Sequence, residues 1–174
     1  MTFRIKGGSD LTVEEFTGDD NQVDAIRRIM SETDATSSCY NFNTLNGEVL
    51  QNNHEMVKTY LAKLGNAHVG FISVEHFTRS ILVLHMAVDK KVQRLCIGSR
   101  LLSIFKAQSN KAIVAVARTR DSVFNSFLLK HGFEKDMPRQ IHYGPGDGGW
   151  RWSWTLAEQI KNPVKAETHR STGK

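Results

Sequence analysis

Residues 92–102 combine residue types that can bind a phosphate group. They read VQRLCIGSRLL and follow, after the three polar residues 89–91, the apolar run ILVLHMAV, which is typical of a buried strand. A small residue followed by Ile-Gly-Ser at a helix start leaves several backbone N–H groups without helical acceptors, and the helix dipole adds partial positive charge. Gly98 lets a phosphate approach the backbone, Ser99 can donate from its hydroxyl, and Arg94 and Arg100 can pair with phosphate oxygens. The segment therefore predicts a pyrophosphate site, with an incidental glycine at a helix start as the alternative.

Two common phosphate-binding motifs do not fit this segment. The P-loop requires Gly-Lys-Ser/Thr, which does not follow here. The dinucleotide-binding fingerprint requires three glycines, and only Gly98 is present. Any phosphate recognition must therefore come from another arrangement of strand, turn and helix.

The elements around this segment predict a mixed α/β fold. Apolar alternation and short apolar runs indicate strands over 11–18, 59–65, 68–77, 81–88, 111–118, 134–143 and 150–156. Helical periodicity and capping residues indicate helices after Asp19 or Asp20, around 47–57, after Asp89 with apolar positions from 97 to 105, and over 121–133. A meander of strands followed by strand–helix–strand–helix–strand gives a mostly antiparallel sheet flanked by helices.

Length and composition predict one domain over residues 1–160, with a loose leader over 1–10 and a polar, disordered tail over 161–174. Two cysteines, Cys39 and Cys96, are too few for a disulfide framework, which favours the reducing cytoplasm. No His/Cys cluster has metal-ligand spacing, so no metal is expected. The first residues lack an apolar signal core, and no apolar run approaches the ~20 residues of a membrane span. Secretion and membrane insertion are therefore not expected.

The run LVLHMAVDKKVQRLCIGSRLL resembles the central motif of the GNAT family of acetyl-CoA-dependent N-acetyltransferases. That motif is a strand ending in Val, a short polar turn, and then Gln/Arg-x-x-Gly-x-Gly/Ala opening a helix. Gln93 stands at its first position, Cys96 at its first glycine and Gly98 at its last. The resemblance covers about residues 11–157, includes the preceding hairpin YLAKLGNAHVGFISVEHF, and is most specific over 81–133.

A second motif strengthens the resemblance. DSVFNSFLLKHGFEK resembles the late helix of the family, which typically ends in Tyr-x-x-x-Gly-Phe and packs beside the coenzyme. Here the ending is Leu128-x-x-x-Gly132-Phe133, so a leucine occupies the position where the family often has the tyrosine that protonates the departing thiolate. This departure weakens the case for catalysis, and His131 and Tyr143 are the alternative acids. The second departure, Cys96 for glycine, is tolerable if the backbone there has helical dihedrals.

The resemblance implies a GNAT-like fold with a splayed central strand pair and direct acetyl transfer from acetyl-CoA to a primary amine. It implies that backbone N–H groups of Met86, Ala87 and Val88 hold the pantetheine and the thioester. The other coenzyme-binding residues that it implies are Gln93, Arg94, Leu95, Cys96, Ile97, Gly98, Ser99 and Asn125. An ordinary polar helix position is the alternative for Asn125.

Two side chains are candidates for the general base. His85 is the titratable residue of an otherwise apolar strand and lies next to the expected thioester site, where imidazole titrates near neutral pH. It can act directly or through water, and the alternative is a structural histidine on a helix-covered face. Glu75 on the neighbouring strand is the second candidate, with an exposed strand-end carboxylate as its alternative.

The sequence leaves the acceptor and the partners open. A net charge of +5 suits a phosphate-bearing coenzyme and also an acidic macromolecule or a nucleic acid. Trp150, Trp152 and Trp154 alternate, so they share one strand face, and they either stack bases or, as we prefer, cover the core or line a homodimer contact. Two other functions therefore stand beside acetyl transfer: a GNAT-fold coenzyme-binding or interaction module without catalysis, and a nucleic-acid-associated protein.

Overall fold

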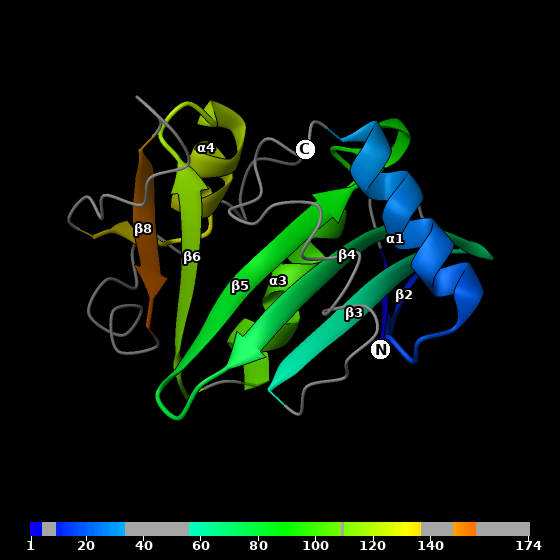
Figure 1. The fold of residues 1–174 in the computed structure, drawn as a ribbon, viewed down its shortest axis with the longest axis horizontal. Helices are drawn as coiled ribbons and strands as arrows, with labels where there is room; N and C mark the ends of the chain where they lie inside the picture. Colours follow the sequence, from blue (N-terminus) through cyan, green and yellow to red (C-terminus); the bar gives the residue numbers. More distant parts are fainter. Residues whose placement is uncertain (5–9, 34–55, 109, 137–147, 156–174) are drawn as a thin grey trace, which may run out of the picture.

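The computed structural model describes residues 1–4, 10–33, 56–108, 110–136 and 148–155. Its centre is an eight-stranded mixed sheet with the strand order β1-β2-β3-β4-β5-β6-β8-β7 (Figure 1). The strands run over Thr2–Arg4 (β1), Asp10–Glu15 (β2), Val57–Leu64 (β3), Ala67–His76 (β4), Ser80–Val88 (β5), Ala112–Arg118 (β6), Glu134–Lys135 (β7) and Gly149–Trp154 (β8). All neighbours pair antiparallel except β5 and β6, which are parallel.

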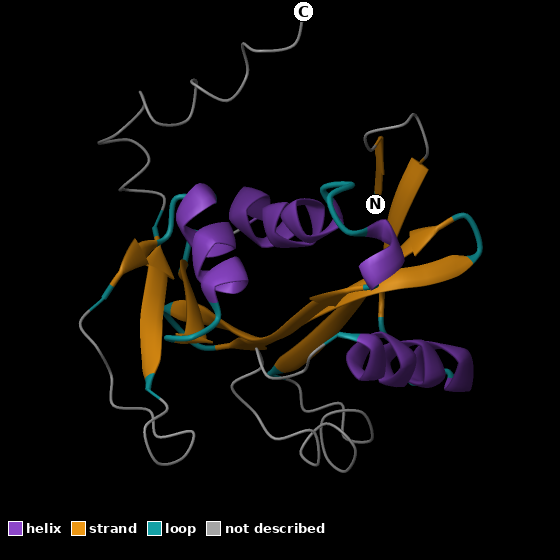
Figure 2. Ribbon diagram, turned by 90° about the horizontal axis from the view of Figure 1, so that it is seen from above, coloured by secondary structure: helices purple, strands orange, loops and turns teal. Residues whose placement is uncertain are grey.

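The helices cover both faces of this sheet. They are α1 (Asp20–Glu32), α3 (Ile97–Gln108) and α4 (Ser122–Lys130), with a short 3₁₀ helix η3 (Lys90–Val92) before α3. Figure 2 shows α3 and α4 on one face and α1 on the other. None of the helices in the described ranges combines the length and apolar character that a membrane span requires.

Helices α1 and α3 pack through the apolar stripes that their sequences predict. In α3 the buried residues Ile97, Leu101, Leu102, Ile104 and Phe105 face the sheet and belong to the larger apolar core. On the opposite face, Ile26 and Ile29 of α1 are fully buried against Leu61 and Phe71. Asp19 caps α1 by accepting from the N–H of Asn21, as the sequence predicts.

The structure corrects one expectation at the N-terminal end of the chain and decides between two alternatives at β8. Residues 1–10 are not merely a leader, because β1 pairs with β2 at the sheet edge. The tryptophans do share one face of β8, but it is the core face: Trp152 is 6% exposed and Trp154 is 1% exposed. These two indoles are therefore not accessible for stacking on bases, and the alternative that they cover the core is confirmed.

Several expectations fall on residues outside the described ranges. The helix expected around 47–57 does so up to position 55, and Val57 opens β3. Cys39, Tyr143 and the tail also lie outside these ranges.

Candidate active site

A gap opens in the sheet between β5 and β6. The two strands pair only over residues 80–83 and 112–115, although β5 continues to Val88 and β6 to Arg118. Figure 1 shows them diverging beyond this point. A β-bulge lies at the same place, because Val83 pairs with Val74 and His85 pairs with Ser73, which leaves Leu84 as the extra residue. The second half of β5, with half-buried Met86, Ala87 and Val88, therefore has an edge that β6 does not cover.

The open half of β5 leads into a tight loop before α3. Asp89 caps η3 through its carboxylate, which accepts from the backbone N–H of Lys91 at 2.9 Å. The loop then passes through Arg94 and Cys96, which have φ angles of 69° and 64°. These are the non-glycine residues with positive φ in the described part of the chain. The left-handed region costs a residue with a Cβ atom about 1–2 kcal/mol, so the loop is strained at both positions.

The condition under which Cys96 would replace glycine without cost is not met. Its backbone is left-handed and not in the right-handed helical region. We expect Cys96→Gly to stabilise the fold by about 1 kcal/mol, which is the strain relieved minus the greater freedom of glycine in the unfolded chain. Urea unfolding measures this difference. Cys96→Ala is the matched control because it removes the thiol but keeps the strained backbone, and an equal gain in both variants would contradict the prediction.

The start of α3 offers backbone N–H groups toward this loop. The carbonyl of Cys96 accepts from the N–H of Arg100 at 3.0 Å, which makes Cys96 the residue that precedes the helix. Its side chain has no oxygen to cap the first turn, in contrast to Asp19 before α1 and Asp121 before α4. The Cys96 side chain therefore does not compete with an anionic ligand for the first N–H groups of α3.

Gly98 lies where a side chain would enter the space between α4 and β5. A Cβ atom on Gly98 would meet the Phe127 ring at 3.6 Å and the Val88 side chain at 3.7 Å, which is ordinary contact distance. Alanine therefore fits at this position, and a large side chain does not. This agrees with the Gly/Ala alternative of the motif.

The candidate phosphate ligands differ in how far the protein already occupies them. Arg94 and Cys96 are exposed, and the amide of Gln93 donates to the carbonyl of Val88 at 3.3 Å. The hydroxyl of Ser99 lies 3.0 Å from Nε2 of His131. The guanidinium of Arg100 stacks over the Phe3 ring, 5.7 Å from its centroid.

The two candidate bases lie on the same face of the sheet as α1. Ala87 packs against the α1 core, and the two-residue period of β5 places His85 on that face. His85 is 4% exposed, and burial lowers its pKa to about 4. The hydroxyl of its cross-strand neighbour Ser73 is hydrogen-bonded to the hydroxyl of Thr59, with the two oxygens 2.7 Å apart. Glu75 lies two residues further along β4 and is half-buried. The bulge in β5 thus places His85 on the α1 face of the sheet, where Glu75 of β4 also lies.

Two residues of α4 have roles in packing. The amide nitrogen of Asn125 donates to the carbonyls of Arg118 and Asp121, and its oxygen accepts from the indole N–H of Trp152 at 2.9 Å. Asn125 therefore joins α4 to β6 and β8. Leu128 is 1% exposed in the core.

His131, the alternative acid at the end of α4, is a poor proton donor at neutral pH. Burial, and then nearby Lys106 and Lys130, lower its pKa to about 4. Its ring is therefore neutral where the reaction would run, and the structure does not favour it as the acid.

Comparison with known proteins relates part of the chain to a protein family. Residues 55–135 match the family model described as the acetyltransferase (GNAT) domain. Over these residues the chain resembles a GNAT domain. The match spans the open half of β5, the loop and both helices that follow, which are the elements that form the site.

Solved structures share the fold of the GNAT domain at low sequence identity. A putative GNAT-family acetyltransferase from Desulfovibrio desulfuricans superposes with a TM-score of 0.69 at 11% identity, covering 83% of this chain and 98% of that one. An acetyltransferase from Salmonella typhimurium that modifies the N-terminal serine of ribosomal protein L7/L12 gives 0.65 at 18% identity, covering 83% and 95%. A putative streptothricin acetyltransferase from Bacillus anthracis, solved with acetyl coenzyme A, gives 0.54 at 23% identity, covering 60% and 66%. A search of curated protein sequences found no match.

Sequence reasoning missed two contributors to the candidate site. Phe127 lies over Gly98, and the signal for it was its position near the end of a helix already expected beside the coenzyme. Arg28 forms an ion pair with Asp89, 61 residues away in the chain. No local pattern predicts such a contact. Among the described residues, no group of His, Cys, Asp and Glu could hold a metal ion.

Proposed function

We propose that this GNAT domain transfers an acetyl group from acetyl-CoA to a primary amine. The observation that carries the proposal is the continuous path from the uncovered edge of β5, through the left-handed loop, to the start of α3. The β5 edge suits the amide-bearing pantetheine, and the N–H groups of α3 suit the pyrophosphate. Both features belong to one short segment, residues 84–99, so a single extended ligand can use them together.

The chemistry that we propose is direct transfer. The amine nitrogen attacks the thioester carbon, the carbon–sulfur bond breaks, and the proton lost by the nitrogen goes to a base while the thiolate takes a proton from water. Backbone N–H groups of residues 86–88 polarise the carbonyl, and positioning supplies much of the rate. His85 is our first candidate for the base, acting directly or through a water, and Glu75 is the second. We propose that residues 93–99 contact the coenzyme. We expect Asn125 to act indirectly, by holding α4 in place.

We favour the amino group of a protein as the acceptor. One fold neighbour, the acetyltransferase from Salmonella typhimurium, modifies the N-terminal serine of a ribosomal protein. The chain itself carries a net charge of +5, which steers an acidic partner toward it. An α-amine also suits the chemistry, because with a pKa of about 7.7–8.0 it is partly uncharged near neutral pH.

Calorimetric titration with acetyl-CoA tests the coenzyme site. We expect wild type and Gly98→Ala to bind with similar affinity, since a Cβ at position 98 makes only ordinary contacts. Gly98→Trp should lose at least about tenfold in affinity because the indole must displace Phe127 or fill the space between α4 and β5. Equal binding by Gly98→Trp would place the coenzyme elsewhere, and absence of binding by wild type would overturn the proposal.

A second function, coenzyme binding without transfer, is favoured by Leu128. This residue is buried in the core and supplies no proton to a leaving thiolate. Release of free thiol from acetyl-CoA in the presence of peptides with free N-termini separates the two functions. Binding without amine-dependent thiol release would favour the module.

A further inference from the structure

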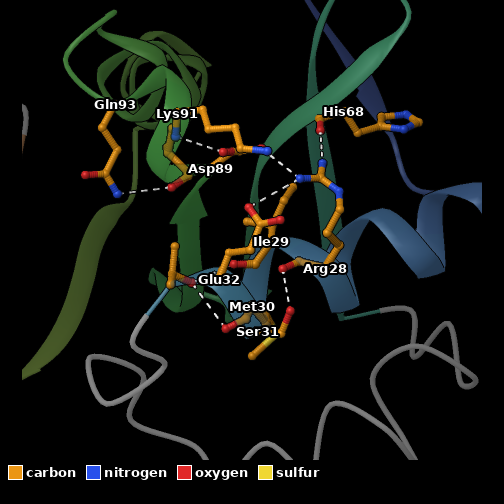
Figure 3. A network of polar contacts seen from close by, with 11 residues as sticks. Arg28, Ile29, Met30, Ser31, Glu32, His68, Asp89, Lys91 and Gln93 are labelled. Atoms are coloured by element: carbon orange, nitrogen blue, oxygen red, sulfur yellow. Dashed lines mark hydrogen bonds and ion pairs between the residues drawn. The ribbon is translucent and has the colours of Figure 1, made fainter.

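The loop that leads into α3 begins at a carboxylate held on both of its oxygens. Asp89 Oδ1 accepts from the backbone N–H of Lys91 at 2.9 Å, and Oδ2 accepts from Arg28 Nη1 at 2.7 Å (Figure 3). The backbone N–H of Asp89 also donates to the carbonyl of Val69 at 2.9 Å. The Asp89 side chain is 8% exposed, so little water is available to replace either partner.

Arg28 connects three parts of the fold at this point. It projects from α1, donates from Nη1 to Asp89, and donates from Nη2 to the carbonyl of His68 in β4 at 2.7 Å (Figure 3). Glu32, one turn further along α1, lies 3.5 Å from Nη1. The hydrogen bond from Arg28 is the main reason that the pKa of Asp89 lies below its ordinary value, so both groups stay charged near neutral pH. The guanidinium thus holds α1, β4 and the loop in one arrangement.

The loop depends on this anchor because its own conformation is unfavourable. The segment between the end of β5 at Val88 and the start of α3 at Ile97 contains Arg94 and Cys96, which are left-handed without being glycine. A strained segment keeps its shape only where its surroundings determine it. Without Arg28, Asp89 would be a nearly buried carboxylate that has lost its cation, which favours movement toward water. Any such movement shifts the N–H groups and side chains that follow.

We propose that Arg28 is a positioning residue for the coenzyme: through Asp89 it fixes the loop whose backbone receives the pyrophosphate. The inference rests on the proposed function, and it adds a residue of α1, outside residues 81–133 where the motif lies. Arg28 itself need not touch the coenzyme. Its effect should therefore disappear when Asp89 no longer carries a charge.

Coenzyme A titrations of a double-mutant cycle test this directly. We expect Arg28→Met and Asp89→Asn each to weaken coenzyme A binding about tenfold, and the double variant to be no weaker than either single variant. Arg28→Lys should recover part of the affinity, because an ammonium can still reach the carboxylate but cannot also hold the His68 carbonyl. Arg27→Met is the matched control, since Arg27 is half-exposed on the same helix and pairs with Asp24 at 3.4 Å.

The outcomes separate the inference from the proposed function. Wild type that binds no coenzyme A overturns both. Wild-type binding with equal affinities for Arg28→Met and Arg27→Met overturns only the inference. Additive losses in the double variant also overturn it, because they would mean that Arg28 acts without Asp89. Thermal unfolding of each variant shows whether the fold persists at the titration temperature.

Discussion

His85→Gln is expected to lower the turnover number for amine acetylation about 10²–10⁴-fold while leaving the affinity for acetyl-CoA within about twofold. Glutamine has a similar reach and can hydrogen-bond, but it cannot accept the proton that the attacking amine releases. The coenzyme contacts that we propose on β5 are backbone groups of residues 86–88, which this substitution keeps. Steady-state thiol release measures the first quantity, and calorimetric titration measures the second.

The pH dependence gives His85 a further signature. Burial lowers its pKa to about 4, so it is neutral and able to accept a proton throughout the neutral and mildly alkaline range. We therefore expect no inflection from His85 in that range, and a rise in rate near about pH 8 if the acceptor is an α-amine with its ordinary pKa. The same lowered pKa makes the fold lose stability as the pH falls from the ordinary histidine pKa of 6.5 toward about 4, because only the unfolded chain binds the proton there.

Glu75→Gln is the matched comparison for this experiment. Glu75 lies on the same face of the sheet as His85 and is half-buried, so the same assays on the two variants compare the two candidate bases. A large loss of rate in Glu75→Gln with little loss in His85→Gln would reverse the assignment. A fall in the unfolding temperature of His85→Gln without loss of rate would make His85 a structural residue.

The parts of the site that sequence predicted are those that local patterns determine. Apolar runs indicated β5 and β6, because the centres of both strands are buried, and helical spacing indicated α3, because one face of this helix is buried. The resemblance added the splayed strand pair, and the pairing of β5 with β6 ends at Val83 as that implies. The gap, the loop and the helix start were thus all predicted in their observed order.

The parts that sequence did not predict depend on contacts distant in the chain or on backbone angles. A Cys in place of Gly does not reveal its own φ, so the left-handed conformation of Cys96 is visible only in three dimensions. β1 is a strand of three residues whose stability comes from pairing with β2, and its local pattern is too short to detect. The contact between Arg28 and Asp89 arises because α1 crosses β4 and the end of β5, which is a property of the whole sheet.

Trp154→Ala is expected to destabilise the fold by about 3–5 kcal/mol, because the substitution removes a large indole from the core. Trp154 is 1% exposed at the junction of β8, β6 and α3, where it pairs in register with Ile113. The Lys106 ammonium lies 4.6 Å from the centroid of its ring, and burial lowers the pKa of Lys106 to about 8. Removing the indole therefore opens a cavity and also deprives a partly buried cation of its aromatic partner.

Urea unfolding of Trp154→Ala beside Trp150→Ala measures this difference within one strand. Trp150 shares the core face of β8 but is only half-buried, with the Lys135 ammonium 3.0 Å from its ring centroid, so its removal should cost about 1 kcal/mol. The ratio of the two losses reports which end of β8 is in the core. If Trp150→Ala costs more than Trp154→Ala, the buried placement of this strand is wrong. In that case Trp154 would be available to stack bases, and single-stranded DNA binding that weakens steeply with salt becomes the measurement that follows.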